Sequence, residues 1–294
     1  MQHKTEIKGF FFASFAAIVY GLMPLCAKYI YAGGCTPESL VFYRGLLSMP
    51  FIYLLMKKNK QVPLDSKKLL SLFVLTFFGT CLTQVFLFGS YNYISTGLST
   101  TIHYSYPIFV FLGTALIFHE KLSKIKILCV ILSTVGILCF YTPGGEISLF
   151  GVALSFLSGI TFAFYIIFLD KSGLKDLPPF QLCFYMALFI SISMIPFTLI
   201  TGTLTYSFNP TTWILLFIFS LFVNLFATMF FQLGVRYIGT QKTSIINTFE
   251  PITSILVGVF VFSEVLTTKI IIGIVIILIA VLILSLFDKS KDPA

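Results

Sequence analysis

Long apolar runs repeat from one end of this chain of 294 residues to the other. The chain is 57% hydrophobic and 10% charged, and its mean hydropathy is +0.99. A soluble globule of this size needs more polar surface than that to cover its core. The composition therefore predicts an all-α integral membrane protein.

Ten of these runs have the length of about 20 mostly apolar residues that a helix needs to cross the hydrocarbon layer. They cover residues 9–30, 37–56, 69–94, 97–118, 124–141, 149–169, 179–201, 211–236, 241–262 and 269–287. The first run is long for a signal peptide and lacks a clear small-residue cleavage pattern, so we expect it to be retained as a span. The connections are too short to form a domain, so function must lie in or beside the bilayer.

Lysine and arginine residues gather in alternate connections between the runs. If the N-terminus is cytoplasmic, most of the 19 positive residues lie on the inner side, with Lys28 and Lys269 outside and Arg44 within a span. The positive-inside rule then predicts a multi-pass protein of the cell membrane with both termini in the cytoplasm. The net charge of +8 is scattered over loops, so we expect no nucleic-acid partner.

The chain contains an internal duplication, in which residues 93–122 align with residues 237–266. The alignment pairs Pro107 with Pro251, Glu120 with Glu264, His103 with Asn247 and Tyr106 with Glu250. Each half contains five runs, and an odd number forces the second half to cross the membrane in the opposite sense. We therefore predict two five-helix inverted repeats, residues 1–143 and residues 148–288.

A polar stripe is predicted along the apolar run 241–262. Thr243, Asn247, Glu250 and Ser254 recur at the spacing that places them on one helix face. Pro251 has no N–H and would leave the carbonyl of Asn247 without a partner, so Pro251 and its counterpart Pro107 are predicted helix breaks. Lipid cannot satisfy such groups, so the stripe must face protein or a wet cavity.

Matching polar residues lie on equivalent runs of the two halves, as a cavity at a pseudo-twofold axis would require. Inverted repeats with proline-interrupted helices and polar groups at mid-membrane are typical of secondary transporters. The predicted substrate-binding residues are Tyr20, Arg44, Gln84, His103, Tyr106, Asn224, Thr228, Asn247 and Glu250.

Alternative roles stay open for several of these side chains. Glu250 could bind an amino group or carry a proton that couples transport, or it could be a hydrogen-bonded acid inside the bundle. Arg44 could hold a substrate carboxylate or serve as a fixed ion-pair partner, and His103 could line the pore or be a satisfied core histidine. For Glu120 and Glu264, a structural role at the ends of their runs is favoured.

Enzyme signatures are missing from the sequence, including H-E-x-x-H, G-x-S-x-G and a glycine-rich phosphate loop. The three histidines and six cysteines show no metal-ligand spacing and no C-x-x-C pair. We therefore predict a protein that is not an enzyme and has no catalytic residues, no metal and no cofactor.

Three short motifs stand out: F-Y-R at 42–44, and the matched pair E-K-L at 120–122 and E-V-L at 264–266. Together with the two mid-run prolines, they resemble the EamA family of the drug/metabolite transporter superfamily over nearly the whole chain. The resemblance implies a ten-helix bundle with both termini inside. It also implies a central cavity lined by spans one to four and six to nine, with spans five and ten at the periphery.

The same resemblance implies small-metabolite substrates, often amino acids, and the superfamily includes aromatic amino-acid exporters and choline importers. Tyr20-Gly21 and Phe162-Ala163 stand where the family often has tryptophan, so the substrate pocket is expected to differ.

These observations lead us to expect a secondary active transporter that moves a small polar metabolite, first an amino acid or related amine, by alternating access. One alternative is a permease for choline, another quaternary ammonium or a nucleoside-like metabolite, and a second is a passive solute channel. Proton coupling would depend on Glu250. The expected partners are a small-molecule substrate and the lipid bilayer, with the chain acting as a monomer or homodimer.

Overall fold

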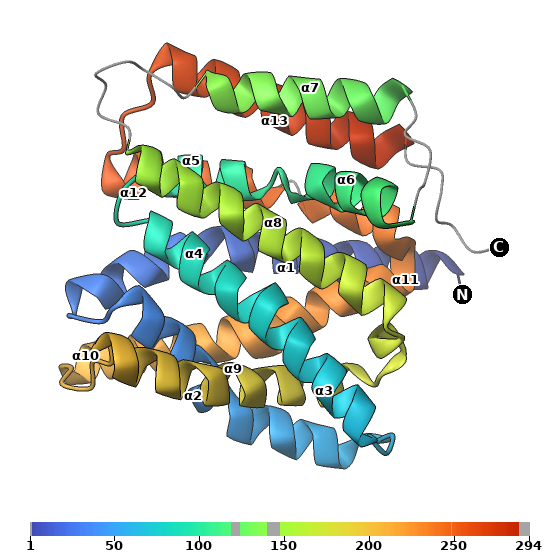
Figure 1. The fold of residues 1–294 in the computed structure, drawn as a ribbon, viewed down its shortest axis with the longest axis vertical. Coiled ribbons are helices and arrows are strands. Elements are labelled where there is room, and N and C mark those ends of the chain that lie inside the picture. Colours follow the sequence, from blue (N-terminus) through green and yellow to red (C-terminus); the bar gives the residue numbers. More distant parts are fainter. Residues whose placement is uncertain (1, 119–123, 140–147, 248, 288–294) are drawn as a thin grey trace.

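The computed structural model describes residues 2–118, 124–139, 148–247 and 249–287, and all regular structure in them is helical (Figure 1). The first half holds α1 (Gln2–Ala32), α2 (Pro37–Lys58), α3 (Ser66–Val74), η1 (Leu75–Cys81), α4 (Leu82–Ser90), α5 (Thr96–His103), α6 (Tyr106–Phe118) and α7 (Lys124–Leu138). The second half holds α8 (Leu149–Lys171), η2 (Leu174–Asp176), α9 (Pro179–Thr201), α10 (Pro210–Ser220), η3 (Leu221–Ala227), α11 (Thr228–Asn247), α12 (Phe249–Phe262) and α13 (Thr268–Phe287).

Six helical stretches of the described residues are long and apolar enough to cross a membrane. They are Ile7–Ala32, Pro37–Lys58, Ser66–Ser90, Leu149–Leu169, Pro179–Thr201 and Pro210–Phe231. Further apolar helices are shorter, among them α12 and α13. The chain therefore has the helical, membrane-spanning character that its composition predicts, and α1 begins at the same end of the bundle at which α13 ends (Figure 1).

Local sequence explains where many of these helices start. Thr36, Ser95, Ser148 and Asn209 each precede a helix and accept a hydrogen bond from a backbone N–H three residues later. Such caps satisfy N–H groups that have no partner inside the first helical turn. α2, α9 and α10 begin with proline, which costs no hydrogen bond at that position.

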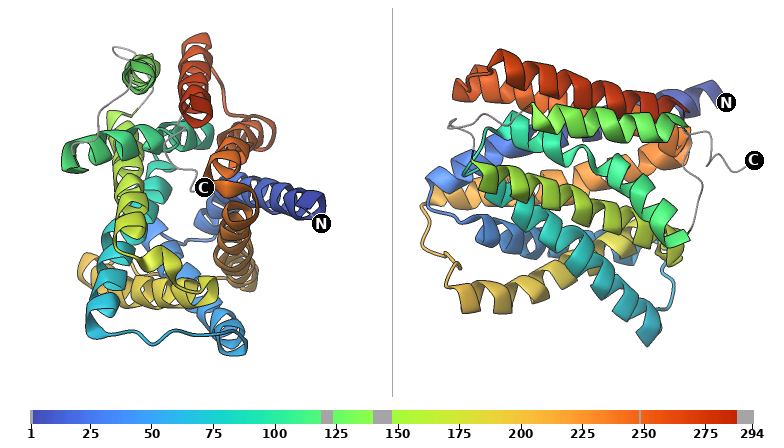
Figure 2. Two further views of the ribbon diagram at one scale, coloured as in Figure 1. Left: turned by 90° about the vertical axis from the view of Figure 1, so that its right-hand side faces the viewer. Right: turned by 45° about the horizontal axis from the view of Figure 1, so that its top comes forward.

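The helices of the two halves pack in corresponding pairs. α1 lies along α11 and α12, while α8 lies along α4, η1, α5 and α6. α2 packs against α9, and α7 packs against α13 at one edge of the bundle (Figures 1 and 2). The helices α1 and α8 therefore pack mainly against helices from the other half of the sequence. Residues far apart in the sequence meet in the middle of the bundle as a result.

One run is divided near a proline that the sequence analysis singled out, and one expected connection is absent. The run 97–118 is divided into α5 and α6, because Pro107 stands in the first turn of α6, where a missing N–H is tolerated. The connection expected between 236 and 241 is wrong, since α11 stays helical through it. Gly239 weakens a helix without ending it, and the following Gln241 and Lys242 are good helix formers.

The polar stripe is consequently shared by two helices. Thr243 and Asn247 lie in α11, whereas Glu250 and Ser254 lie in α12. All four are buried, as expected for a stripe that avoids lipid. Residue 248 lies outside the described residues, and Pro251 is the third residue of α12.

Candidate functional site

Arg44 lies within α2 with 7% of its surface exposed. Its Nε donates to the Oδ1 of Asn224 in η3 at 2.6 Å. The Asn224 amide donates back to the Arg44 carbonyl at 2.7 Å and to the Ser48 hydroxyl at 2.9 Å. Among the described residues, no carboxylate lies within ion-pair distance of Arg44. Its Nε is thus held by a neutral side chain.

Glu250 lies in the first turn of α12, also with 7% of its surface exposed. The Asn247 amide donates to its Oε2 at 3.3 Å. No lysine or arginine in the described parts of the chain lies within ion-pair distance of it.

Tyr20 lies in α1, and its hydroxyl donates to the Oγ1 of Thr228 at 3.0 Å. At the next residue, Gly21, a Cβ atom would stand 2.7 Å from the Glu250 carbonyl oxygen. Only glycine lets α1 approach α12 this closely, so Gly21 brings Tyr20 to the site.

Aromatic rings cluster where α6 meets α8. The Tyr106 ring lies 4.7 Å from Phe162 and 5.3 Å from Tyr104, measured between centroids. Faces of such rings attract ammonium groups.

One buried polar atom beside Glu250, the Asn247 Oδ1, has no hydrogen-bond partner in the described residues. The Asn247 orientation is physically sensible, because the opposite one would direct an amide oxygen at a carboxylate. An unsatisfied buried polar group costs about 1–3 kcal/mol, so such groups are expected where a ligand or water completes them.

The other predicted residues divide between the site and its surroundings. Asn224 and Thr228 hold Arg44 and Tyr20, as described above. His103 hydrogen-bonds through Nδ1 to the Ser158 hydroxyl at 2.9 Å, and its ring lies 5.9 Å from Tyr106. Gln84 in α4 has a buried Oε1 without a partner among the described residues, and no interaction joins it to Glu250.

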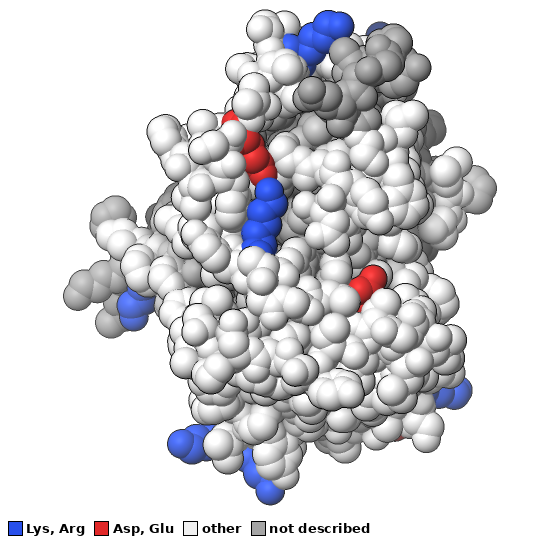
Figure 3. Space-filling view, turned by 90° about the vertical axis from the view of Figure 1, so that its left-hand side faces the viewer, with Lys and Arg blue, Asp and Glu red and all other residues white. Residues whose placement is uncertain are grey.

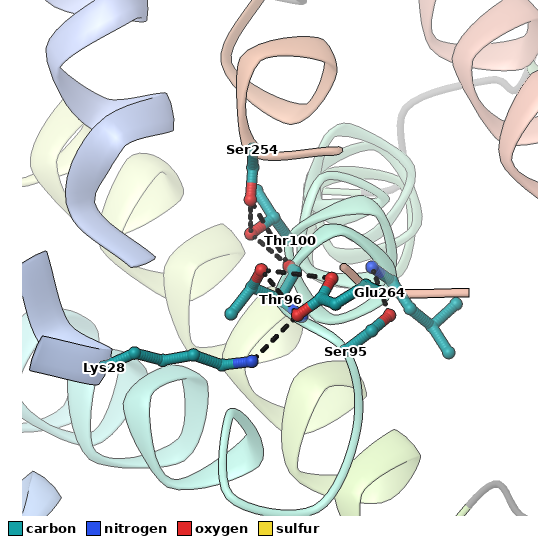
Figure 4. Close-up of polar contacts among 7 residues, drawn as sticks. Lys28, Ser95, Thr96, Thr100, Ser254 and Glu264 are labelled. Atoms are coloured by element: carbon teal, nitrogen blue, oxygen red, sulfur yellow. Dashed lines mark hydrogen bonds and ion pairs between the residues drawn. The ribbon is translucent and has the colours of Figure 1, made fainter. Parts of the chain in front are cut away.

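Lys28 and Glu264 form an ion pair that sequence reasoning did not predict. Lys28 donates to the Glu264 Oε1 at 2.8 Å (Figure 4). Their opposite charges are the sequence signal that could have predicted this pair, because Lys28 and Glu264 both stand near the ends of apolar runs. Figure 3 shows the end of the bundle opposite the N-terminus, where one acidic and one basic side chain touch on a largely uncharged surface.

Glu120, in the E-K-L motif at 120–122, lies outside the described residues. In the described residues, no cluster of three or more His, Cys, Asp or Glu side chains is placed to hold a metal ion. The candidate site combines one basic side chain, Arg44, and one acidic side chain, Glu250, with neutral hydrogen-bonding groups and aromatic rings.

A family model described as the EamA-like transporter family matches the chain twice, over residues 7–142 and over residues 149–286. An uncharacterized transporter of Archaeoglobus fulgidus is 26% identical over 243 residues, which is 83% of this chain and 83% of that protein. The uncharacterized transporter YvbV of Bacillus subtilis is 26% identical over 214 residues, 69% of this chain and 67% of that protein.

A solved structure also resembles this chain. A protein chain known from a crystal structure superimposes on this chain with a TM-score of 0.67 and is 12% identical to it in sequence. The superposition covers 96% of this chain and 98% of the matched chain. At that identity the likeness concerns the fold alone.

Proposed function

The chain belongs to the EamA-like transporter family, and from this premise we propose that it is a secondary active transporter of an amino acid or a related amine. The relatives and the apolar helices support a membrane solute transporter. The substrate class is our inference from the site, and the cell membrane with cytoplasmic termini is our inference from the lysine distribution.

One observation carries the substrate proposal. Arg44 and Glu250 are both buried, and each lacks an oppositely charged partner in the described residues. The partner of Arg44, Asn224, and the partner of Tyr20, Thr228, lie four residues apart, while Gly21 beside Tyr20 packs against the backbone of Glu250. Unpaired buried charges are costly inside a membrane, and they persist where a ligand or ion pairs with them. A zwitterionic substrate would pair with both side chains. Its carboxylate can accept hydrogen bonds from the Arg44 guanidinium, while its ammonium group binds the Glu250 carboxylate.

Alternating access is the proposed mechanism. The paired packing of α1 on α11 and α12, and of α8 on α4, α5 and α6, supports two inverted repeats. So does the occurrence of one π-helical stretch, η1 and η3, in each half. Two halves of similar structure can rock about a shared site and expose it to each side in turn. The ten-span arrangement, residues 1–143 and 148–288, is part of this proposal.

A second candidate substrate is a quaternary ammonium compound such as choline. The clustered rings of Tyr104 and Tyr106 favour it, because aromatic faces attract alkylated cations that cannot donate hydrogen bonds. This candidate leaves Arg44 without a ligand. Competition between amino acids, their decarboxylated amines and choline separates the two substrates.

The proposal is tested with purified protein in liposomes preloaded with an unlabelled amino-acid mixture. Counterflow of labelled amino acids is expected, and Glu250→Gln should abolish it while the variant remains monodisperse. Unsaturable flux would indicate a passive channel instead. Proton coupling through Glu250 predicts that an imposed pH gradient drives net uptake in the native protein, and unchanged flux would remove that part of the proposal.

A further inference from the structure

One ion pair ties three segments together at the end of the bundle opposite the N-terminus. Lys28 of α1 donates to the Glu264 Oε1 at 2.8 Å. Glu264 lies between α12 and α13 and also accepts from the Thr96 backbone N–H at 3.0 Å and the Thr96 hydroxyl at 3.1 Å (Figure 4). Because Thr96 begins α5, the carboxylate also benefits from the positive end of that helix. We call Lys28, Thr96 and Glu264 the outer clamp.

The backbone after α12 is shaped to present the Glu264 carboxylate. Ser263 adopts a left-handed conformation with φ of 53°, which is unfavourable for a residue with a side chain. The Glu264 N–H then donates to the Gly258 carbonyl at 3.0 Å. A Cβ atom at Gly258 would collide with the carboxylate, so this position leaves space that only glycine provides.

Lys28 has a further partner that fixes its position. Its ammonium group lies 4.5 Å from the centroid of the Phe262 ring, an arrangement that favours a cation over an aromatic face. The side chains of Lys28 and Glu264 remain 27% and 10% exposed. A partly exposed ion pair of this kind is weak enough to break and re-form.

Hydrogen bonds between α5 and α12 lead from the outer clamp towards Glu250. One turn deeper than Thr96, the Thr100 hydroxyl hydrogen-bonds to Ser254 at 3.1 Å, and Ser254 also donates to the Thr96 carbonyl at 3.4 Å. One further turn along α12 stands Glu250. These contacts close α5 against α12 between Glu250 and the end of the bundle.

We propose that the outer clamp is the outer gate of the transport cycle. While Lys28, Thr96 and Glu264 are joined, a solute cannot pass between α1, α5 and α12 to reach Glu250 from that side. Breaking the ion pair frees α12 and its following connection from both α1 and α5 at once. The gate inference rests on the transporter proposal, but its test requires no substrate and can succeed or fail by itself.

The test measures solvent access just below the clamp. All six native cysteines are replaced, and Thr100→Cys is introduced as a reporter, since Thr100 is only 2% exposed in the closed arrangement. A membrane-impermeant maleimide is added outside intact cells, and the labelling rate of position 100 is followed. Glu264→Gln and Lys28→Met are each expected to raise the rate by about fivefold, the effect of losing a contact of this strength on an opening equilibrium.

Three further variants define the cause. The double variant of Lys28→Met and Glu264→Gln should label no faster than either single variant, because both remove the same ion pair. Gly258→Ala should also raise the rate, since it displaces the carboxylate without removing a charge. Lys269→Gln, at an exposed lysine of α13, is the matched control and should leave the rate unchanged.

Lys28→Met keeps the bonds between Thr96 and Glu264, so it provides a folded variant should Glu264→Gln not be monodisperse. Unchanged labelling in monodisperse clamp variants would overturn the proposal. A rise seen only in inside-out vesicles would overturn it as well, because the gate would then face the cytoplasm.

Discussion

Arg44 and Asn224 hold each other through hydrogen bonds in both directions: the guanidinium Nε donates to the side-chain oxygen, and the side-chain amide donates to the Arg44 carbonyl. A neutral residue thus positions a buried cation without cancelling its charge. This arrangement leaves Arg44 electrostatically available to a substrate, which an ion pair within the protein would prevent.

Replacing Asn224 with leucine should destabilise the protein. Asn224→Leu removes the acceptor of the buried guanidinium and leaves the Arg44 carbonyl without its side-chain donor, at an expected cost of about 1–3 kcal/mol. Thermal unfolding in detergent measures this loss. Phe222→Leu, at an exposed position of the same π-helical stretch, is the control, and equal melting temperatures for both variants would contradict the role given to Asn224.

Arg44→Lys separates charge from geometry. Lysine retains the positive charge but cannot donate both to Asn224 and in a forked manner to a carboxylate. The apparent KM for an amino acid should rise by about tenfold, equivalent to about 1.4 kcal/mol, while transport of the corresponding decarboxylated amine changes little. If both substrates lose affinity equally, Arg44 does not contact the carboxylate.

Gly21→Ala tests the close approach of α1 to α12. The added Cβ would stand 2.5 Å from the Cβ of Thr253 and 2.7 Å from the Glu250 carbonyl, so the helices must separate, at an expected cost of about 1–3 kcal/mol. Gly89→Ala is the matched control, because its nearest neighbour would be 3.8 Å away. Melting temperatures of the two variants are compared, and an equally stable Gly21→Ala protein would refute the tight contact.

His103 is expected to act as a structural residue. Ser158→Ala removes the partner of the His103 Nδ1 and should lower stability by about 1 kcal/mol while substrate selectivity stays unchanged. Chemical unfolding and a competition panel in liposomes measure the two effects. A shift in selectivity without a loss of stability would assign His103 to the solute path instead.

The sequence predicts the helical membrane character and the neighbourhood of the helix interruptions because these depend on local chemistry. Proline disfavours a continuous helix whatever surrounds it, and a helix begins at Tyr106, one residue before Pro107. The predicted break at Pro251 stays a prediction, because residue 248 lies outside the described residues. The helical path through residues 237–240 could not be predicted, since a single glycine among good helix formers leaves the outcome to tertiary packing.

Contacts between side chains on different helices were harder to predict from the sequence. The polar stripe of Thr243, Asn247, Glu250 and Ser254 was predicted from spacing, and its burial follows from the cost of polar groups in lipid. The partners of Arg44 and Lys28 depend on which helices meet. No local pattern distinguishes Asn224 from another buried amide, or Glu264 from a residue that merely ends a helix.

The two π-helical stretches, η1 and η3, have a consequence for how such a chain tolerates change. A π turn contains one residue more than an α turn, so deleting a single residue from η3 could restore regular α-helix geometry without shortening the span appreciably. Because the extra residue is contained within one turn, the helical segments on both sides of the deletion would keep the faces that they present to the bundle. Loss of Asn224 itself would remove the partner of Arg44 alone, whereas Tyr20 would keep its bond to Thr228, which follows η3.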